Sequence, residues 1–283
     1  RQSYSQFRRL ARRVRFRLPC SNPPKLKQAI QLNNNQLQHR LLCRQHRNND
    51  RTAACKNLMR LNKFVALSLG VSRRKADKLI EQGKILVNGD RAVLGRQISQ
   101  SDIVLYNSRE LHIQPKKLIL LHKPVGYLCS RASQGGVPTI YELLPKSLHH
   151  LKPVGRLDKD SSGLILLTND GDFAHQMTHP SFYKIKRYLV TLDQPLQPLH
   201  RQMINDFGVQ LPDGPSRLTL ERQHEGDDHR WIVQMSEGRN RQIRRTFAAL
   251  GYTVKKLHRT DFGNYSLGGM KRGEFQESNL TPN

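Results

Sequence analysis

A polar, turn-rich segment at residues 155–163 contains the side chains best suited to covalent chemistry. It reads Gly-Arg-Leu-Asp-Lys-Asp-Ser-Ser-Gly and leads directly into the apolar residues 164–167, so a buried strand would hold it at a rigid sheet edge. An ionised carboxylate such as that of Asp158 can form a temporary covalent bond that splits one difficult exchange into easier steps. An aspartate in such a loop is more often a turn former, so its position alone makes Asp158 only a candidate nucleophile.

An arginine-rich segment, Gly-Arg-Asn-Arg-Gln-Ile-Arg-Arg at residues 238–245, supplies cations. Desolvation in a pocket that closes around a substrate would neutralise a carboxylate unless a cation stands beside it. Arg241, Arg244 and Arg245 are three and four residues apart, so they share one helix face and suit phosphate contacts equally well. Both uses are compatible within one motif.

Other groupings of reactive side chains lack the spacing of a known kind of site. His175 and His179 are four residues apart, but no glutamate follows His175 as it does in metalloproteases. Cys20, Cys43 and Cys55 are irregularly spaced and form neither a zinc pattern nor a disulfide framework. The sequence also lacks a glycine-rich phosphate loop of the ATP or NAD type. We therefore expect neither a metal nor a cofactor.

The elements that would position these groups follow from hydrophobic patterning. Short apolar runs predict buried strands, and apolar residues at helical spacing before Gly251 predict a helix that ends there. The apolar pattern lapses around Pro115, which predicts a linker over residues 106–116. We expect an α+β domain with a mixed or antiparallel sheet over residues 117–283. Its expected strands cover residues 118–121, 163–168, 186–192 and 231–235, and its expected helix covers residues 240–250.

Residues 59–105 predict a separate, small α/β module with a basic surface. An apolar helical face ends at Gly70, and Ser72 then stands at the N-cap of a second helix. Asn88-Gly89 suits a tight hairpin turn further on. Charge runs usually only solvate a helix face, but few acids balance these, so RNA binding is favoured. The exposed side of the second helix carries Arg73, Arg74, Lys75 and Lys78.

The formal net charge of +26 attracts polyanions and makes nucleic acid the first partner to consider. Residues 1–58 hold 14 of the 48 Lys and Arg residues but a single acid, Asp50. Because this segment has few apolar residues at regular spacing, we expect it to be disordered. It could be an RNA-attracting arm, an organelle transit peptide, or the product of a start codon assigned too early, since Met59 opens the first ordered pattern.

The module at residues 59–105 resembles the RNA-binding S-four domain found in a small-subunit ribosomal protein. The match rests on Arg60-Leu61-Asn62-Lys63, Ser72-Arg73-Arg74-Lys75-Ala76-Asp77 and Val87-Asn88-Gly89. The resemblance implies RNA contacts from Arg60, Lys63, Arg73, Arg74, Lys75 and Lys78.

The segment at residues 155–171 is similar to the signature of the RsuA/RluB/RluF group of pseudouridine synthases. Three more segments agree in order and spacing, and together they cover nearly all of residues 118–277. The departures are Ser161, where threonine is commoner, and His122, where asparagine is commoner, and neither removes an expected catalytic group. The three segments are Leu-His-Lys-Pro-Val-Gly at 121–126, Lys-Arg-Tyr-Leu-Val at 186–190 and Glu-Gly-Arg-Asn-Arg-Gln-Ile-Arg-Arg at 237–245.

This resemblance implies that Asp158 attacks the target nucleotide, after which the base detaches from its ribose, turns, and rejoins through carbon. It implies that Tyr188, which core packing would otherwise explain, stacks on the target uracil and aids later proton removal. Arg244 best matches the cation that faces the carboxylate, with Arg239 or Arg156 as alternatives. Further RNA contacts are expected from Arg156, Lys186, Arg239, Asn240, Arg241 and Gln242.

We therefore expect a monomeric enzyme that isomerises one uridine of ribosomal RNA, in the large subunit because the segment order is closest to the RluB-like members. Its partner would be RNA, either alone or in a pre-ribosomal particle. The alternatives are a synthase for small-subunit RNA or transfer RNA, and a non-catalytic RNA-binding ribosome assembly factor. The sequence has no apolar run long enough to span a membrane. We expect a cytoplasmic location, or an organelle if the N-terminal segment is a transit peptide.

Overall fold

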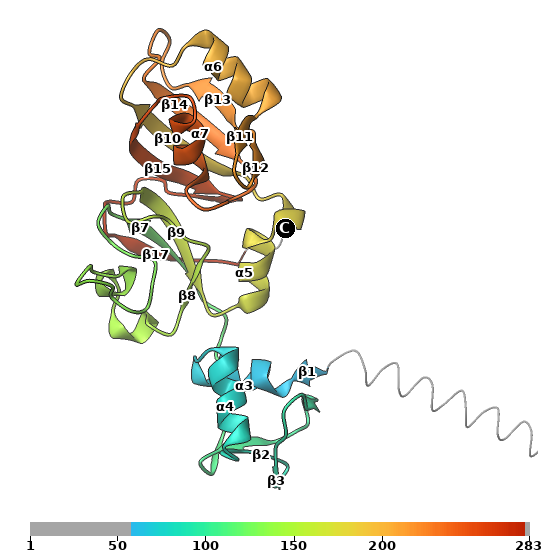
Figure 1. Ribbon diagram of the computed structural model, residues 1–283. Helices are drawn as coiled ribbons and strands as arrows, with labels where there is room; N and C mark the ends of the chain where they lie inside the picture. Colours follow the sequence, from blue (N-terminus) through green and yellow to red (C-terminus); the bar gives the residue numbers. More distant parts are fainter. Residues whose placement is uncertain (1–57, 281–283) are drawn as a thin grey trace, which may run out of the picture. The chain divides into compact units, whose positions relative to one another are not determined.

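The computed structural model describes residues 58–280 of the 283-residue chain (Figure 1). Except for Leu58, the segment predicted to be disordered, residues 1–58, lies outside the described residues.

The first described region contains two short helices followed by small strands. Gly70 ends the first helix in the left-handed conformation, with φ 66°, and the Ser72 hydroxyl accepts a hydrogen bond from the Lys75 N–H at 3.1 Å. Both capping predictions are therefore confirmed. The elements are β1 (Met59–Arg60), α3 (Leu61–Leu69), α4 (Arg73–Glu81), β2 (Ile85–Val87), β3 (Asp90–Arg91), β4 (Gln97–Ile98), β5 (Val104–Tyr106) and β6 (Arg109–Glu110).

Two tight hairpins shape the four-stranded sheet β3-β2-β5-β6. The predicted Asn88-Gly89 turn joins β2 to β3, with φ values of 55° and 89°. Asn107 and Ser108, with φ values of 50° and 62°, join β5 to β6 in the same way. The linker predicted over residues 106–116 therefore begins later than expected. This second turn is hard to recognise from sequence, because it lacks the glycine that usually marks one.

The larger region, from β7 to β17, is built on a nine-stranded sheet. Its main order is β13-β14-β10-β15-β9-β7-β17, with β16 paired to β15 and β8 paired to β9. All pairs are antiparallel except β9 with β15, so the predicted α+β class with a mixed sheet is confirmed. The strands are β7 (Leu118–Lys123), β8 (Lys152–Val154), β9 (Ser162–Thr168), β10 (Lys186–Leu192), β13 (Thr219–Arg222), β14 (Arg230–Met235), β15 (Val254–Phe262), β16 (Tyr265–Ser266) and β17 (Phe275–Ser278).

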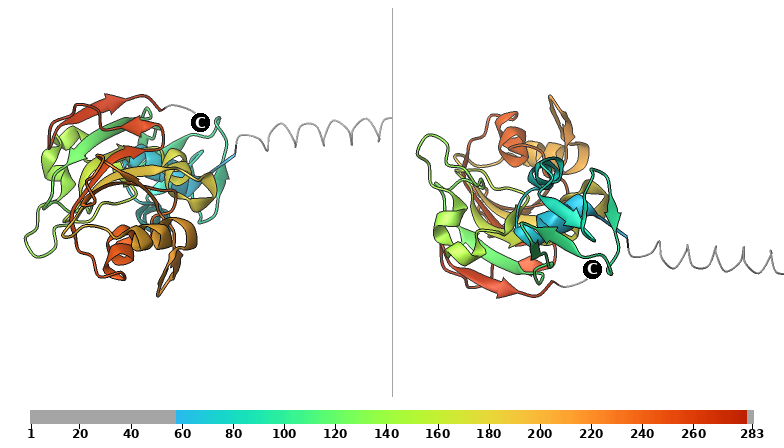
Figure 2. Two further views of the ribbon diagram at one scale, coloured as in Figure 1. Left: turned by 90° about the horizontal axis from the view of Figure 1, so that it is seen from above. Right: turned by 90° about the horizontal axis from the view of Figure 1, so that it is seen from below.

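Helices and short hairpins cover this sheet. Figure 1 shows α7 beside β15 and α5 beside β8, while β17 borders β7 in both Figures 1 and 2. The predicted helix over residues 240–250 is α7, shorter by two residues at each end. The remaining elements are η2 (Ile140–Leu143), η3 (Lys146–Leu148), α5 (Gly171–Thr178), η4 (Pro180–Phe182), α6 (Pro198–Gln202), η5 (Met203–Phe207), β11 (Val209–Leu211), β12 (Gly214–Ser216) and α7 (Gln242–Ala248).

The central strand β9 is buried on both faces, which explains its continuous apolar run. Ile165 and Leu167 join one buried cluster with Trp231, whereas Leu164 and Leu166 face a second cluster. Side chains alternate across a strand, so both cores hold β9 in place. The loop that precedes β9 is therefore anchored at its C-terminal end by packing on two sides.

Strands β9, β15 and β10 bring Gly163, Arg259 and Tyr188 side by side. In the parallel pair, Gly163 of β9 lies opposite Arg259 of β15, and Arg259 in turn lies opposite Tyr188 of β10. Gly163 has a φ of 110°, and a Cβ atom there would lie 2.2 Å from the Arg259 carbonyl oxygen. Only glycine permits this approach, which places the loop at residues 155–161 beside β15.

Candidate active site

The loop at residues 155–161 is held through its backbone, and this leaves Asp158 free to face outward. The fully buried Lys123 ammonium donates hydrogen bonds to the carbonyl oxygens of Ser161 at 2.6 Å and Pro124 at 2.9 Å. The Gly126 N–H donates to the Lys159 carbonyl at 2.7 Å. The Asp158 side chain is 30% exposed. The backbone is thus fixed while the carboxylate stays accessible, as a nucleophile requires.

Asp158 opens into a cavity of about 330 Å³, which is within the range of small-molecule sites. The cavity combines charged groups with the apolar side chains of Met235, Leu257 and Phe262. Of the site residues predicted in the catalytic region, Asn240 and Arg244 do not line it. Those that do line it are Arg156, Asp158, Lys186, Tyr188, Arg239, Arg241 and Gln242.

Arg241, rather than Arg244, is the cation beside Asp158. Its Nη1 lies 3.6 Å from an Asp158 carboxylate oxygen, and it also forms a two-pronged pair with Asp160 at 3.1 and 3.2 Å. The expectation that Arg244 faces Asp158 is therefore wrong in this structure. The Arg244 guanidinium contacts Asp160 instead. It donates to the Asp160 carbonyl oxygen at 2.9 Å and lies 3.4 Å from the Asp160 carboxylate.

The backbone conformation at the start of α7 explains why Arg241, and not Arg244, lies beside Asp158. Arg241 precedes α7 with φ 46° and ψ 33°, the left-handed conformation, which is uncommon outside glycine. Nearly a helical turn further on, Arg244 instead donates to the Val254 carbonyl at 2.7 Å and so ties α7 to β15. The regular helix assumed from residue 240 onward could not reveal that the chain turns at Arg241.

Asp160 concentrates positive charge next to Asp158. Partial burial would raise the pKa of Asp160, but hydrogen bonds from Arg241 and the charges of Arg244 and Arg241 outweigh it and lower that pKa below its ordinary value. Asp160 therefore stays ionised and holds both guanidinium groups against the loop. The sequence motif contains Asp160, but its pattern suggests no role for this residue.

Lys186 is a buried structural cation, which differs from the RNA contact expected of it. Its ammonium donates to the carbonyl oxygens of Ser236 at 2.9 Å and Glu237 at 3.2 Å. Burial first, and repulsion from Arg259 second, lower its pKa to about 8, although Glu237 partly opposes this. These contacts fasten β10, which carries Tyr188, to the loop that leads to Arg241.

Tyr188 is almost completely buried and forms part of the cavity wall. Both interpretations of this residue, core packing and a ring at the substrate, are compatible with that position. Arg259 was not singled out from the sequence. It is buried, lines the same cavity, and donates from Nε to the Leu164 carbonyl at 2.7 Å. An arginine within an alternating strand gives no signal of this role by its type alone.

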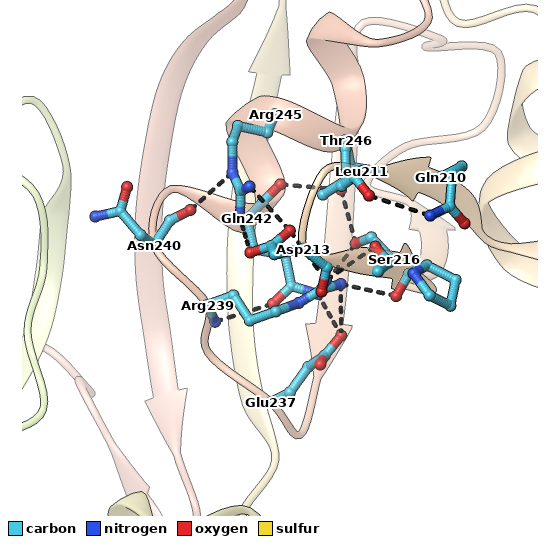
Figure 3. Close-up of polar contacts among 12 residues, drawn as sticks. Gln210, Leu211, Asp213, Ser216, Glu237, Arg239, Asn240, Gln242, Arg245 and Thr246 are labelled. Atoms are coloured by element: carbon cyan, nitrogen blue, oxygen red, sulfur yellow. Dashed lines mark hydrogen bonds and ion pairs between the residues drawn. The ribbon is translucent and has the colours of Figure 1, made fainter.

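A network of polar contacts secures the arginine-rich loop to the β11–β12 hairpin (Figure 3). Arg239 donates to the carbonyl oxygens of Asp213, Gly214 and Pro215 at 2.8–3.0 Å. Arg245 pairs with both carboxylate oxygens of Asp213 at 2.9 and 2.7 Å. The guanidinium of Arg239 is thus occupied within the protein, contrary to the RNA contact expected of it.

Gln242 completes this network. Its Nε2 donates to the Ser216 hydroxyl at 3.0 Å and to the Glu237 carboxylate, and it is buried. Its amide therefore serves the fold of the loop as well as the cavity wall. Arg156 and Asn240, by contrast, are exposed, and Arg156 lies at the cavity rim, where a phosphate could reach it.

Between residues 58 and 280, no group of three or more His, Cys, Asp or Glu side chains is arranged to hold a metal ion. No helix in the same range has the length and apolar character needed to cross a membrane.

Comparison with known proteins identifies both regions. Residues 117–249 match the family model for RNA pseudouridylate synthase, and residues 59–104 match the S4 domain. The ribosomal small subunit pseudouridine synthase A of Pasteurella multocida is 36% identical over 226 residues, which cover 77% of this chain and 95% of that protein. The chain belongs to the RNA pseudouridylate synthase family.

Other members of this RNA pseudouridine synthase family support the assignment. The dual-specificity RNA pseudouridine synthase RluF of Shigella flexneri is 38% identical, with 77% of this chain and 75% of that protein covered. Ribosomal large subunit pseudouridine synthase B of Bacillus subtilis is 34% identical, with 79% and 92% covered. A crystal structure of a pseudouridylate synthase superposes with a TM-score of 0.57 at 36% identity, covering 78% of this chain and 96% of that one.

The predicted family and S-four domain are thus confirmed. The protein is an RNA pseudouridine synthase whose catalytic region follows an RNA-binding S-four domain.

Proposed function

We propose that this synthase isomerises a uridine of ribosomal RNA through a covalent intermediate on Asp158. The observation that carries the proposal is the Asp158 carboxylate, which opens into the cavity 3.6 Å from the Arg241 guanidinium and shares that cavity with Tyr188. Arg241 thus places a cation beside the carboxylate that would act as the nucleophile. The names of the relatives, which include synthases of both ribosomal subunits, support ribosomal RNA as the substrate class.

The chemistry requires no net change in composition. The Asp158 oxygen bonds to the nucleotide as the bond between the base and its ribose breaks. The base turns and its carbon bonds to the ribose as the bond to the Asp158 oxygen breaks, which frees the carboxylate. That ring carbon then loses its proton while the ring nitrogen gains one. We assign the stacking and proton-removal role to Tyr188, and the apolar walls at Met235, Leu257 and Phe262 limit water around the detached base.

Reaching the base requires taking the uridine out of its stack, which costs a few kcal/mol. Phosphate contacts can offset this energy. We propose that the exposed basic side of α4 in the S-four domain supplies such contacts, together with Arg156 at the cavity rim. Arg239 and Lys186 are excluded from this set because the Arg239 Nη groups and the Lys186 ammonium donate to backbone carbonyls.

Within ribosomal RNA we propose that the target is a uridine of the large subunit, because the order of the matched sequence segments is closest to that of the RluB-like members. The relatives are named for the small subunit, the large subunit and dual specificity, so the experiment needs separate substrates. Isolated large-subunit RNA, isolated small-subunit RNA and transfer RNA would each be incubated with the protein, and pseudouridine mapped chemically. Product in large-subunit RNA alone supports the proposal, and product only in another RNA replaces it.

The role of Asp158 is tested in the same assay with Asp158→Ala. The matched control is Asp206→Ala, which removes an exposed carboxylate that does not line the active-site cavity. We expect product from the wild type and the control and none from Asp158→Ala. Equal product from all three would remove Asp158 from the mechanism. No product from the wild type on any RNA would favour the non-catalytic assembly factor.

A further inference from the structure

A short turn between α5 and β10 begins at the active-site cavity and carries exposed apolar side chains. Thr178 and Pro180 line the cavity, and the chain then leaves it through η4. Three apolar side chains follow within a few residues and face solvent. Their exposed fractions are 43% for Phe182, 76% for Tyr183 and 55% for Ile185.

The turn is fixed although its apolar side chains are exposed. The Tyr183 N–H donates to the Pro180 carbonyl at 3.1 Å, and the Gly263 N–H donates to the Ile185 carbonyl at 2.8 Å. Phe182 packs edge-to-face against His175 and His179, with ring centroids 5.9 and 6.2 Å apart. These contacts hold the backbone of the turn at both ends.

Tyr183 adopts an unusual backbone conformation. Its φ of 48° and ψ of 40° are left-handed, a region that a bulky residue seldom occupies. A strained residue persists only where its surroundings fix it, and such residues gather at functional sites. Core packing does not account for a tyrosine that is three-quarters exposed. The ring is instead exposed to solvent, three residues after Pro180 at the cavity.

The charge around this turn favours a polyanionic partner. Residues 173–192 contain no Asp or Glu, and Lys184 follows Tyr183 directly. Among the described residues Lys184 takes part in no ion pair, and Arg156 is exposed at the same cavity. An exposed aromatic ring among cations is the arrangement on which unpaired nucleobases stack, because every base has a π face and carries a phosphate beside it.

We propose that Tyr183, supported by Phe182, is a stacking platform for unpaired bases next to the uridine that enters the cavity. The position of that uridine rests on the proposed function, whereas base stacking itself does not require catalysis. Flanking bases would stack on the platform instead of on one another. Because stacking is tolerant of sequence, it would add affinity without selecting a particular neighbouring base.

The test measures the affinity of the protein for two fluorescent single-stranded chains. One is oligouridine and the other is a base-free analogue with the same phosphates. Both are about ten nucleotides long, a length typical of such sites. The variant is Tyr183→Asn, because asparagine tolerates the left-handed conformation but lacks the ring. We expect its affinity for oligouridine to fall about fivefold or more, which corresponds to the removal of one base–aromatic stack. Affinity for the base-free chain should not change.

Two control variants isolate the ring. Tyr183→Phe keeps it and should retain the wild-type affinity for oligouridine. Phe207→Ala removes a ring that is 72% exposed on η5 and does not line the active-site cavity, and it should leave both affinities unchanged. Equal losses on both chains, an equal loss in Phe207→Ala, or no loss in Tyr183→Asn would each overturn the platform.

A kinetic readout on ribosomal RNA separates this proposal from the proposed function. Tyr183→Asn should raise KM and leave kcat near the wild-type value, because the platform binds flanking bases and not the reacting one. A fall in kcat at unchanged KM would contradict it. If Asp158→Ala still made product, the catalytic proposal would fail, yet the binding comparison on oligouridine would still decide the role of Tyr183.

Discussion

At the scale of single residues, two carboxylates two positions apart have different surroundings. Among the described residues Asp158 forms one ion pair, with Arg241 at 3.6 Å, whereas Asp160 pairs with both Arg241 and Arg244. A nucleophile must keep an available oxygen, so a carboxylate with fewer partners suits that task. Asp160, with more partners, is suited to hold the arginines. Residue type alone could not divide these roles, since both are aspartates in one loop.

Lys186 provides a prediction of pH-dependent stability. Its folded-state pKa is about 8, below the ordinary value of 10.5, so between these values the unfolded state binds more protons. Stability from this residue therefore rises with pH across that window. We expect the stability of the wild type relative to Lys186→Met to increase by roughly 2–3 kcal/mol from about pH 7 to about pH 10.

Chemical denaturation of both proteins across this pH range measures the effect. The difference between the two unfolding free energies is the relevant quantity, because other titrating groups are common to both proteins and cancel. A difference that is constant with pH, or that moves against the wild type as pH rises, contradicts a buried ammonium at Lys186.

At the scale of elements, four of the nine strands of the large sheet could be predicted from the sequence. The four expected strands coincide with β7, β9, β10 and β14 within two residues at each end, because apolar runs and alternation report directly on burial. The Asn107-Ser108 turn and the left-handed Arg241 were missed, since neither carries the glycine that marks such conformations. The choice between Arg241 and Arg244 depended on that second conformation, so the pairing with Asp158 could not be predicted.

Gly163 tests whether the close approach of β9 and β15 is essential. An added Cβ would lie 2.2 Å from the Arg259 carbonyl, and the φ of 110° disfavours any other residue. We expect Gly163→Ala to destabilise the protein by about 3 kcal/mol or more, since clash and backbone strain add. Thermal or chemical unfolding provides the measurement.

Gly171 is the matched control for this substitution. It lies in the first turn of α5, with open space around the position of a Cβ atom. Gly171→Ala should be neutral or stabilise by up to about 1 kcal/mol. Similar effects of the two substitutions would show that β9 does not approach β15 closely enough to require glycine.

At the scale of the whole molecule, the net charge of +26 overstates the positive charge that is free to meet RNA. In the arginine-rich motif, Arg239 and Arg245 pair with Asp213, and Arg241 and Arg244 pair with Asp160. Within residues 58–280, the four exposed basic residues of α4 take part in no ion pair. The exposed side of α4 in the S-four domain therefore carries positive charge that no described acid neutralises.

This distribution predicts how salt affects RNA binding. Replacing the four basic residues of α4 by glutamine should weaken ribosomal RNA binding and reduce the slope of log affinity against log salt by about one for each phosphate that is no longer neutralised. The control replaces four exposed basic residues of the catalytic region and changes the net charge equally. If binding depends on total charge alone, the two variants will have the same slope; we expect the control to keep a slope close to the wild type. The substituted residues are Arg73, Arg74, Lys75 and Lys78 in the variant, and Lys146, Arg217, Lys255 and Lys256 in the control.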